Sequence, residues 1–196
     1  MPKRIRSKKK LIPISAAFLF FHLCAAGLIW ASDEIAWKEI ETKHTIIRYQ
    51  SLDDLKIFDK KVDYSPDASE SGLSWLFSQP EGKDFEEKLK NKIDALYERV
   101  QEILDMRKKM LKIKVNIYSN KRQLKDAFFR IYKKEGQYRA WYIFEFNTIY
   151  ITIADLHEGM LAHEMAHSII DHYLTVRPPS ASAEILARYV DSHLHE

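Results

Sequence analysis

The sequence predicts an α+β domain, and three observations support that prediction. The segment LKIKVNIY at 111–118 alternates apolar and polar side chains, which is typical of a half-buried strand. Residues 84–106 repeat apolar side chains at helical spacing, which predicts an amphipathic helix with one buried face. Two more helical segments, 155–174 and 180–194, close the chain. Strands and helices are therefore expected first, followed by two closing helices.

The residues ahead of the long helix predict one strand, one short helix and a loop. Residues 37–50 are rich in β-branched and aromatic side chains, as strands are. Ser51 can cap a short helix over 52–62, because its hydroxyl can accept a free backbone amide. Residues 64–83 carry the Ser, Pro, Gly and Asp of a long surface loop.

The region after the long helix predicts another helix and a pair of strands. Asn120 can cap a helix over 121–134, which is expected to stop at Gly136. Residues 138–145 and 148–153 have the composition of two strands joined by a tight turn.

The two closing helices have recognisable ends. Asp155 and Glu158 form a capping box, which predicts the start of a helix that runs to about Leu174. The segment 176–179, Val-Arg-Pro-Pro, ends that helix, because a residue before proline disfavours helical backbone. Ser180 can then cap the final helix.

Composition places the chain among ordinary globular proteins. A hydrophobic content of 46% and a charged content of 30% allow a packed core. The net charge of +3 comes from the start of the chain: residues 1–31 hold six basic and no acidic residues, and the remaining 25 basic residues face 28 acidic ones. A domain with this balance has no basic footprint for nucleic acid, so nucleic acid is not an expected partner.

Residues 1–31 have the pattern of an export signal. A cluster of Lys and Arg precedes the apolar run 11–30, and the small residue Ala31 follows. The segment is expected to be cleaved as a signal peptide or to stay as an N-terminal signal anchor, the only membrane contact. In both cases the positive end stays in the cytoplasm, and the domain 32–196 is periplasmic or secreted. The only cysteine, Cys24, lies in this segment, so the domain has no thiol.

The strongest chemical motif is H-E-x-x-H, at His163-Glu164-Met165-Ala166-His167. Residues four apart lie on one face of a helix, so His163 and His167 can bind one metal ion. Glu164 is offset by about 100° from His163, near enough to be the general base for a zinc-activated water without being a ligand. The helix is otherwise apolar, and buried polar side chains need partners. The alternative is that all three are core residues satisfied by backbone carbonyls or a salt bridge.

A third metal ligand must come from elsewhere. Asp171 lies about 12 Å along the helix axis from His163, too far to share an ion. His172 is similarly distant, and Tyr173 stands where a metzincin would have its third histidine. Glu184, in the first turn of the next helix, is the best candidate, and a carboxylate suits a helix N-terminus. The alternative for Glu184 is an ordinary helix-start charge that faces solvent.

The segments HEMAHSIIDHY and PPSASAEILARYV resemble the gluzincin group of zinc peptidases. In that group a second helix carries a glutamate within a segment similar to E-G-L-A-x-Y. The matching positions here are Glu184, Leu186, Ala187 and Tyr189. The opening WKEIETKHTIIRY at 37–49 also resembles, more loosely, the first strand of small peptidase-MA-like domains.

The resemblance implies a fold and a substrate edge. The fold would be a zincin-like domain with a small mixed sheet, an active-site helix bearing H-E-x-x-H and a closing C-terminal helix. The strand 148–153, just before the active-site helix, would be the edge that pairs with an extended substrate. The close match covers residues 155–191.

Two positions depart from the gluzincin pattern. Ile185 replaces the glycine usual after the ligand glutamate, and Arg188 stands where a second acidic residue is common. Asp171 and Asp191 are the candidates for accepting hydrogen bonds from the other ring nitrogens of the histidines. The resemblance also implies a side chain that stabilises the oxyanion, and the candidates are Tyr189, His172 and His193.

These observations predict an exported metallopeptidase that uses one Zn²⁺ ion to hydrolyse peptide bonds in proteins or peptides. The residues assigned to it are the ligands His163, His167 and Glu184 and the general base Glu164. The alternative is a non-catalytic domain, which either binds zinc for structure or is a pseudo-peptidase interaction domain. A structural zinc site is closed by four protein ligands, so a further donor such as His157 or His172 would favour that alternative.

Overall fold

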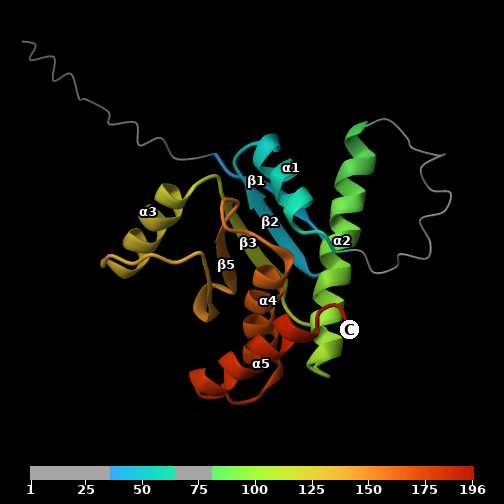
Figure 1. The fold of residues 1–196 in the computed structure, drawn as a ribbon, viewed down its shortest axis with the longest axis vertical. Coiled ribbons are helices and arrows are strands. Elements are labelled where there is room, and N and C mark those ends of the chain that lie inside the picture. Colours follow the sequence, from blue (N-terminus) through green and yellow to red (C-terminus); the bar gives the residue numbers. More distant parts are fainter. Residues whose placement is uncertain (1–35, 65–80) are drawn as a thin grey trace, which may run out of the picture. The chain divides into compact units, whose positions relative to one another are not determined.

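The computed structural model describes residues 36–64 and 81–196, and these residues belong to one unit of the chain (Figure 1). The predicted export segment 1–31 and most of the predicted loop 64–83 lie outside the described residues. Within the described ranges, no helix has the length and the apolar character needed to cross a bilayer.

The described strands form one five-stranded mixed sheet in the order β1-β2-β3-β5-β4. Strands β2, β3 and β5 run parallel to one another, while β1 and β4 pair antiparallel at the two edges. The predicted α+β class and the mixed character of the sheet are confirmed. The strands are β1 Lys38–Glu41, β2 Thr45–Tyr49, β3 Ile113–Tyr118, β4 Ala140–Ile143 and β5 Thr148–Thr152.

Helices cover both faces of the sheet (Figure 1). The main hydrophobic core lies between one face and four helices: α1 Leu52–Lys61, α2 Glu81–Ile103, α4 Glu158–Tyr173 and α5 Ser180–His193. A smaller cluster, rich in aromatic rings, joins the opposite face to α3, Lys121–Tyr132. Along β5 the side chains alternate between the two clusters: Ile149 and Ile151 join the main core and Tyr150 joins the smaller one.

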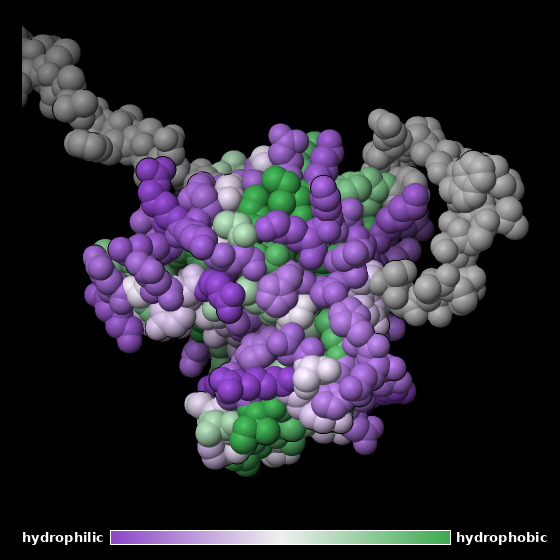
Figure 2. Space-filling model, viewed as in Figure 1, coloured by the Kyte–Doolittle hydropathy of each residue, from purple (hydrophilic) through white to green (hydrophobic). Residues whose placement is uncertain are grey.

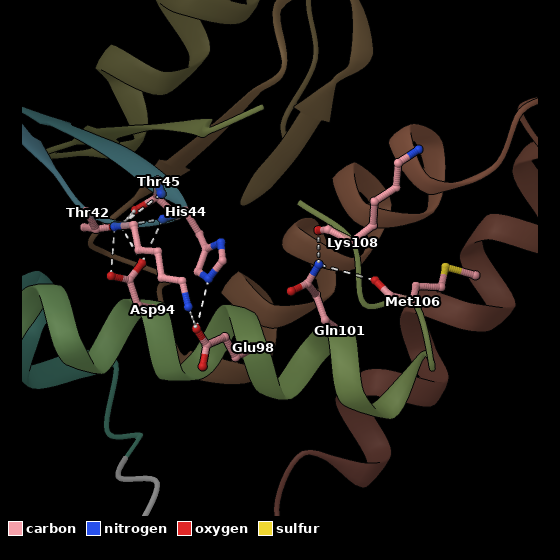
Figure 3. A network of polar contacts seen from close by, with 9 residues as sticks. Thr42, His44, Thr45, Asp94, Glu98, Gln101, Met106 and Lys108 are labelled. Carbon is pink, nitrogen blue, oxygen red and sulfur yellow. Dashed lines mark hydrogen bonds and ion pairs between the residues drawn. The ribbon is translucent and has the colours of Figure 1, made fainter. Parts of the chain in front are cut away.

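The prediction of a single strand over residues 37–50 is wrong, because the segment folds into the hairpin β1–β2. Asp94 of α2 holds the turn between the strands (Figure 3). It accepts hydrogen bonds from the Thr42 hydroxyl at 2.6 Å and from the amides of Lys43 at 2.9 Å and His44 at 3.0 Å. The composition of residues 37–50 is that of one strand throughout. The chain nevertheless reverses direction there, because Asp94, about fifty residues away, binds the turn.

Helix α2 ends at Ile103, three residues before the predicted end. Asp105 adopts a left-handed backbone with φ 51°, which stops the helix. Gln101 then fixes the outgoing loop: its side-chain amide donates to the carbonyls of Met106 at 3.3 Å and Lys108 at 3.0 Å (Figure 3).

The two predicted strands after α3 exist as β4 and β5. Strand β4 is shorter than predicted, and β4 rather than β5 forms the edge of the sheet. Residues 144–146 form a 3-10 turn after β4, and Asn147 follows with a left-handed φ of 43°. Strand β5 lies between β3 and β4, so the prediction that residues 148–153 form the substrate edge is wrong. The edge beside α4 is β4, because the tight turn folds β4 against the outer side of β5.

Candidate metal centre and active site

Helix α4 carries the H-E-x-x-H motif and begins at Glu158, one residue after its N-cap His157. The Nδ1 atom of His157 accepts the amide of Met160 at 3.1 Å. Asp155, which the sequence predicts as the cap, instead pairs with Lys121 at 2.9 Å. The predicted capping box is therefore wrong, because an imidazole nitrogen supplies the acceptor that a carboxylate was expected to supply.

Helix α4 is buried on almost every side, as its apolar composition predicts. It lies between the sheet and α5 (Figure 1), and Leu161, Ala162 and Met165 have no exposed surface. Two polar side chains retain some exposure: the side chains of His163 and His167 are each 21% exposed. Both histidines therefore reach solvent on a helix that is otherwise buried among apolar side chains.

The imidazoles of His163 and His167 converge with the carboxylate of Glu184. The two Nε2 atoms are 3.2 Å apart, and the Oε2 atom of Glu184 lies 3.6 Å from the first and 3.5 Å from the second. Ligand atoms about 2.0–2.2 Å from a tetrahedral zinc ion lie about 3.4 Å from one another. The spacing of the three donors matches that requirement, and among the described residues these three form the group that could hold a metal ion, called the metal-binding cluster below.

The turn after α4 and the small side chains of α5 bring Glu184 to this position. The Pro179 carbonyl accepts the amides of Ser182 at 2.9 Å and Ala183 at 3.1 Å, which starts α5 directly after the two prolines. Ala183 and Ala187 are buried against the core, and their small size lets the backbones of α5 and α4 approach closely. The first turns of α5 therefore lie over the middle of α4.

Glu184 uses its two oxygens for different partners. Its Oε1 atom accepts a hydrogen bond from Arg188 Nε at 2.8 Å, while Oε2 points to the two histidines. The bond from Arg188 is the main reason that the pKa of Glu184 lies below its usual value of 4.5. Arg188, the departure from the gluzincin pattern, thus keeps Glu184 ionised, the form in which a carboxylate binds a cation.

Glu164 is a deeply buried carboxylate of the site, with 9% of its surface exposed. Burial, and then the nearby charge of Glu184, raise its pKa from 4.5 to about 8. A hydrogen bond from the backbone of Tyr142 acts in the opposite direction. A cation held by the neighbouring donors would also favour ionisation of Glu164. Burial likewise lowers the pKa of His167, with the charge of His163 as the second cause, so His167 favours the neutral form that binds metals.

These groups open into a pocket of about 320 Å³ between α4, α5 and strand β4. The lining includes Ala140, Trp141 and Tyr142 of β4 together with His163, Glu164 and His167 of the motif. A larger hollow of about 1380 Å³ lies beside α2 and the loop after it, and its lining includes neither the motif nor Glu184. The two histidines, Glu164 and Glu184 therefore belong to the smaller pocket.

Three residues expected to support the site have other neighbours. Asp171 lines the pocket but pairs with Arg177 at 2.9 Å rather than with an imidazole. Asp191 lies at the start of α4, where a Cβ on Gly159 would come within 2.3 Å of its Oδ1 atom. Tyr189 stacks on His193 with ring centroids 3.8 Å apart, and it is 48% exposed outside the pocket. The geometry therefore supports none of the roles that the sequence suggested for these residues.

The other histidines near the motif are occupied elsewhere. His157 caps α4, and His193 stacks on Tyr189. The Nδ1 atom of His172 lies 2.9 Å from the Ser168 carbonyl and 3.3 Å from the Tyr142 hydroxyl. None of them joins the three donors in the described chain, so the cluster offers three candidate ligands there.

Tyr142 and Arg177 are pocket residues that the sequence analysis did not single out. Tyr142 approaches Glu164 through its backbone, and its hydroxyl donates to Asn147 Oδ1 at 3.3 Å. Arg177, in the turn between α4 and α5, lines the pocket beside Pro178. A signal for Arg177 existed, because a short turn that joins two ligand-bearing helices must pass close to the site. Tyr142 had no comparable signal, since its place depends on strand order.

Comparisons of the chain with protein-family models, with curated proteins and with solved structures gave no match.

Proposed function

We propose that this protein is a zinc metallopeptidase of the gluzincin type, which hydrolyses peptide bonds in proteins or peptides. The observation that carries the proposal is the convergence of His163, His167 and Glu184 at tetrahedral spacing beside Glu164, a carboxylate one residue along the same helix. Two imidazoles and one carboxylate are a donor set that suits zinc.

The number of donors favours catalysis over a structural role. Structural zinc sites are commonly closed by four protein ligands, whereas catalytic sites have three and keep one position open. The described chain brings three donors together, and the pocket lies directly beside them. A bound zinc ion would polarise a substrate carbonyl and lower the pKa of water at that open position.

The residues of the chain have separate tasks in this proposal. Glu164 takes the proton of the attacking water and passes it to the leaving amine. Arg188 holds one oxygen of Glu184, so that the other stays directed at the histidines. Strand β4 offers the backbone groups of a sheet edge along the pocket, where an extended peptide can add as a further strand.

The test compares the wild type with Glu164→Gln on an exported-protein mixture, with cleavage sites identified by proteomics. We expect Glu164→Gln to retain zinc but to lose hydrolysis by about 10²–10⁴-fold, because a general base is removed and no ligand is. His167→Ala should lose both zinc and hydrolysis. Equal cleavage by purified wild type and Glu164→Gln would contradict the mechanism.

The alternative function is a pseudo-peptidase or structural zinc domain, and the same experiment separates it. That domain would bind zinc in both proteins and produce no cleavage in either. The location outside the cytoplasm is a prediction from residues 1–31. A reporter that works only outside the cytoplasm, fused after Glu196, tests it, and an inactive reporter would contradict export.

A further inference from the structure

The candidate pocket contains one side chain with a permanent positive charge. Among the described residues that line it, Arg177 is the only Lys or Arg, and three others are carboxylates: Glu164, Asp171 and Glu184. Arg177 belongs neither to the metal-binding cluster nor to the H-E-x-x-H motif. Its place in the pocket therefore calls for a role of its own.

Two contacts hold Arg177 in one orientation. Its Nη2 atom lies 2.9 Å from Asp171 Oδ2, and its guanidinium carbon lies 4.4 Å from the centroid of the Phe144 ring. A guanidinium group stacked on an aromatic ring and bonded to a carboxylate loses little further freedom when it binds a second group. The side chain is therefore preorganised.

The exposed member of this pair is Arg177. The side chain of Arg177 is 51% exposed, whereas that of Asp171 is 7% exposed. A guanidinium group carries five N–H donors, and Asp171 accepts from one nitrogen. No other polar partner of Arg177 is found in the described chain, so an incoming ligand meets free donors rather than the buried carboxylate.

The spacing along α4 between His167 and Asp171, the partner of Arg177, suits a substrate group that lies close to the bond over the metal-binding cluster. Asp171 lies one helical turn beyond His167, which is about 6 Å along the axis at about 1.5 Å per residue. An extended peptide covers that distance with about two residues of about 3.3 Å each. A group bound by Arg177 would thus lie within one or two residues of the bond over the metal-binding cluster.

We propose that Arg177 is a specificity-determining residue that binds a carboxylate of the substrate, carried by an acidic side chain or by the C-terminus. The inference rests on the proposed function and names its substrate class. A planar guanidinium with parallel N–H donors matches a carboxylate, and the partial charge neutralisation by Asp171 makes the preference moderate.

The test uses peptide binding to zinc-loaded Glu164→Gln, which does not depend on turnover. The probes are acetylated tetra-alanine with a free C-terminus, its C-terminal amide, and amides in which each alanine in turn is Glu or Gln. We expect one carboxylate-bearing peptide to bind at least about 10-fold more tightly than its uncharged counterpart in calorimetric titrations. Whether the free C-terminus or a Glu position gives the difference identifies the source of the carboxylate.

Variants in the Glu164→Gln background then assign the preference to Arg177. Adding Arg177→Gln should abolish it, and adding Arg177→Lys should weaken it, because the charge stays but the paired donors are lost. Arg122→Gln is the matched control, since Arg122 is an exposed arginine on α3 away from the pocket, and it should keep the preference.

Two results would overturn the inference. One is that Glu164→Gln binds all charged and uncharged peptides within a factor of about three. The other is that the preference survives Arg177→Gln. Because binding is read as a ratio within each protein, partial misfolding of a variant lowers both affinities and leaves the ratio interpretable. If the wild type does not hydrolyse peptides, the proposed peptidase function is contradicted. The binding preference assigned to Arg177 is measured without turnover and is judged separately.

Discussion

The carboxylate of Glu184 is oriented toward the candidate metal site by one neighbouring side chain. Glu184 is 40% exposed, and such a side chain would ordinarily sample several rotamers in solvent. Arg188, one turn later on the same helix, holds Oε1 at 2.8 Å and leaves Oε2 facing both imidazoles. The position that departs from the gluzincin pattern therefore helps to orient the third donor.

Removal of Glu184 should cost more zinc affinity than removal of Arg188. We expect Glu184→Ala to weaken zinc binding by more than about 100-fold, since it deletes a donor, and Arg188→Ala by about 10–100-fold, since it deletes a partner of that donor. Competition with a chromophoric chelator measures both constants. If Glu184→Ala and the wild type bind zinc with equal affinity, Glu184 is not a zinc ligand.

At the residue scale, the sequence could predict the site where the residues lie close together on one helix. His163, Glu164 and His167 follow from helical spacing, and Glu184 followed from elimination and from the gluzincin resemblance. Asp191 and Tyr189 were misplaced, because the rotation of α5 about its own axis cannot be read from sequence. Asp171, predicted to accept a hydrogen bond from a histidine, pairs instead with Arg177, which comes from a turn whose path is set by packing.

At the scale of elements, the hairpin β1–β2 depends on a contact with α2. Asp94 accepts three hydrogen bonds from the turn, and Glu98, one turn further along α2, lies 2.7 Å from Lys43 Nζ and 3.0 Å from His44 Nε2 (Figure 3). One side of α2 therefore fixes the point at which the chain reverses between the first two strands.

Asp94→Ala should destabilise the fold without changing the metal site. We expect a loss of roughly 2–4 kcal/mol in the free energy of unfolding, because three hydrogen bonds to a charged acceptor disappear. Urea denaturation gives the value, and zinc affinity should stay within about three-fold of the wild type. Asp126→Ala, at an exposed position on α3, should change stability by less than about 0.5 kcal/mol. A similar, small loss for both variants would show that Asp94 does not hold the hairpin.

The element pattern was predictable where local signals agree with packing. The helices capped by Ser51 and Asn120 begin where expected, and the alternation at 111–118 gave strand β3. The errors at the first hairpin and at the sheet edge have long-range causes. The turn at 42–45 depends on Asp94, and the exchange of edge from β5 to β4 depends on strand order, which alternation cannot reveal.

At the scale of the whole molecule, the proposed metal ion would join α5 to α4. Helix α5 contributes Ala183, Ala187 and Val190 to the core, but much of its surface faces solvent. The view in Figure 2 shows mainly hydrophilic side chains, with apolar ones gathered near the top, where Figure 1 places α1, and at the foot, where it places α5. Exposed apolar residues of this region include Val176 and Ile185, at 79% and 69%.

Zinc should therefore stabilise the protein measurably. At a free zinc concentration of about 1,000 times the Kd, we expect about 4 kcal/mol of added stability. That corresponds to a rise in the melting temperature of about 10 °C for a domain of this size. Calorimetry with zinc and with a chelator measures the shift, and in Glu184→Ala it should be largely lost. Identical melting temperatures with zinc and with chelator would contradict the metal site.

The separation of the donors along the chain also sets the order in which the site can form. His163 and His167 are synthesised before the two prolines, and Glu184 comes after them. The two histidines are brought together by α4 alone, whereas Glu184 reaches them only when α5 packs against α4. The polypeptide therefore has two of the three donors in place before the third, and a protease that acts by this site would acquire its activity only when α5 has folded back over α4.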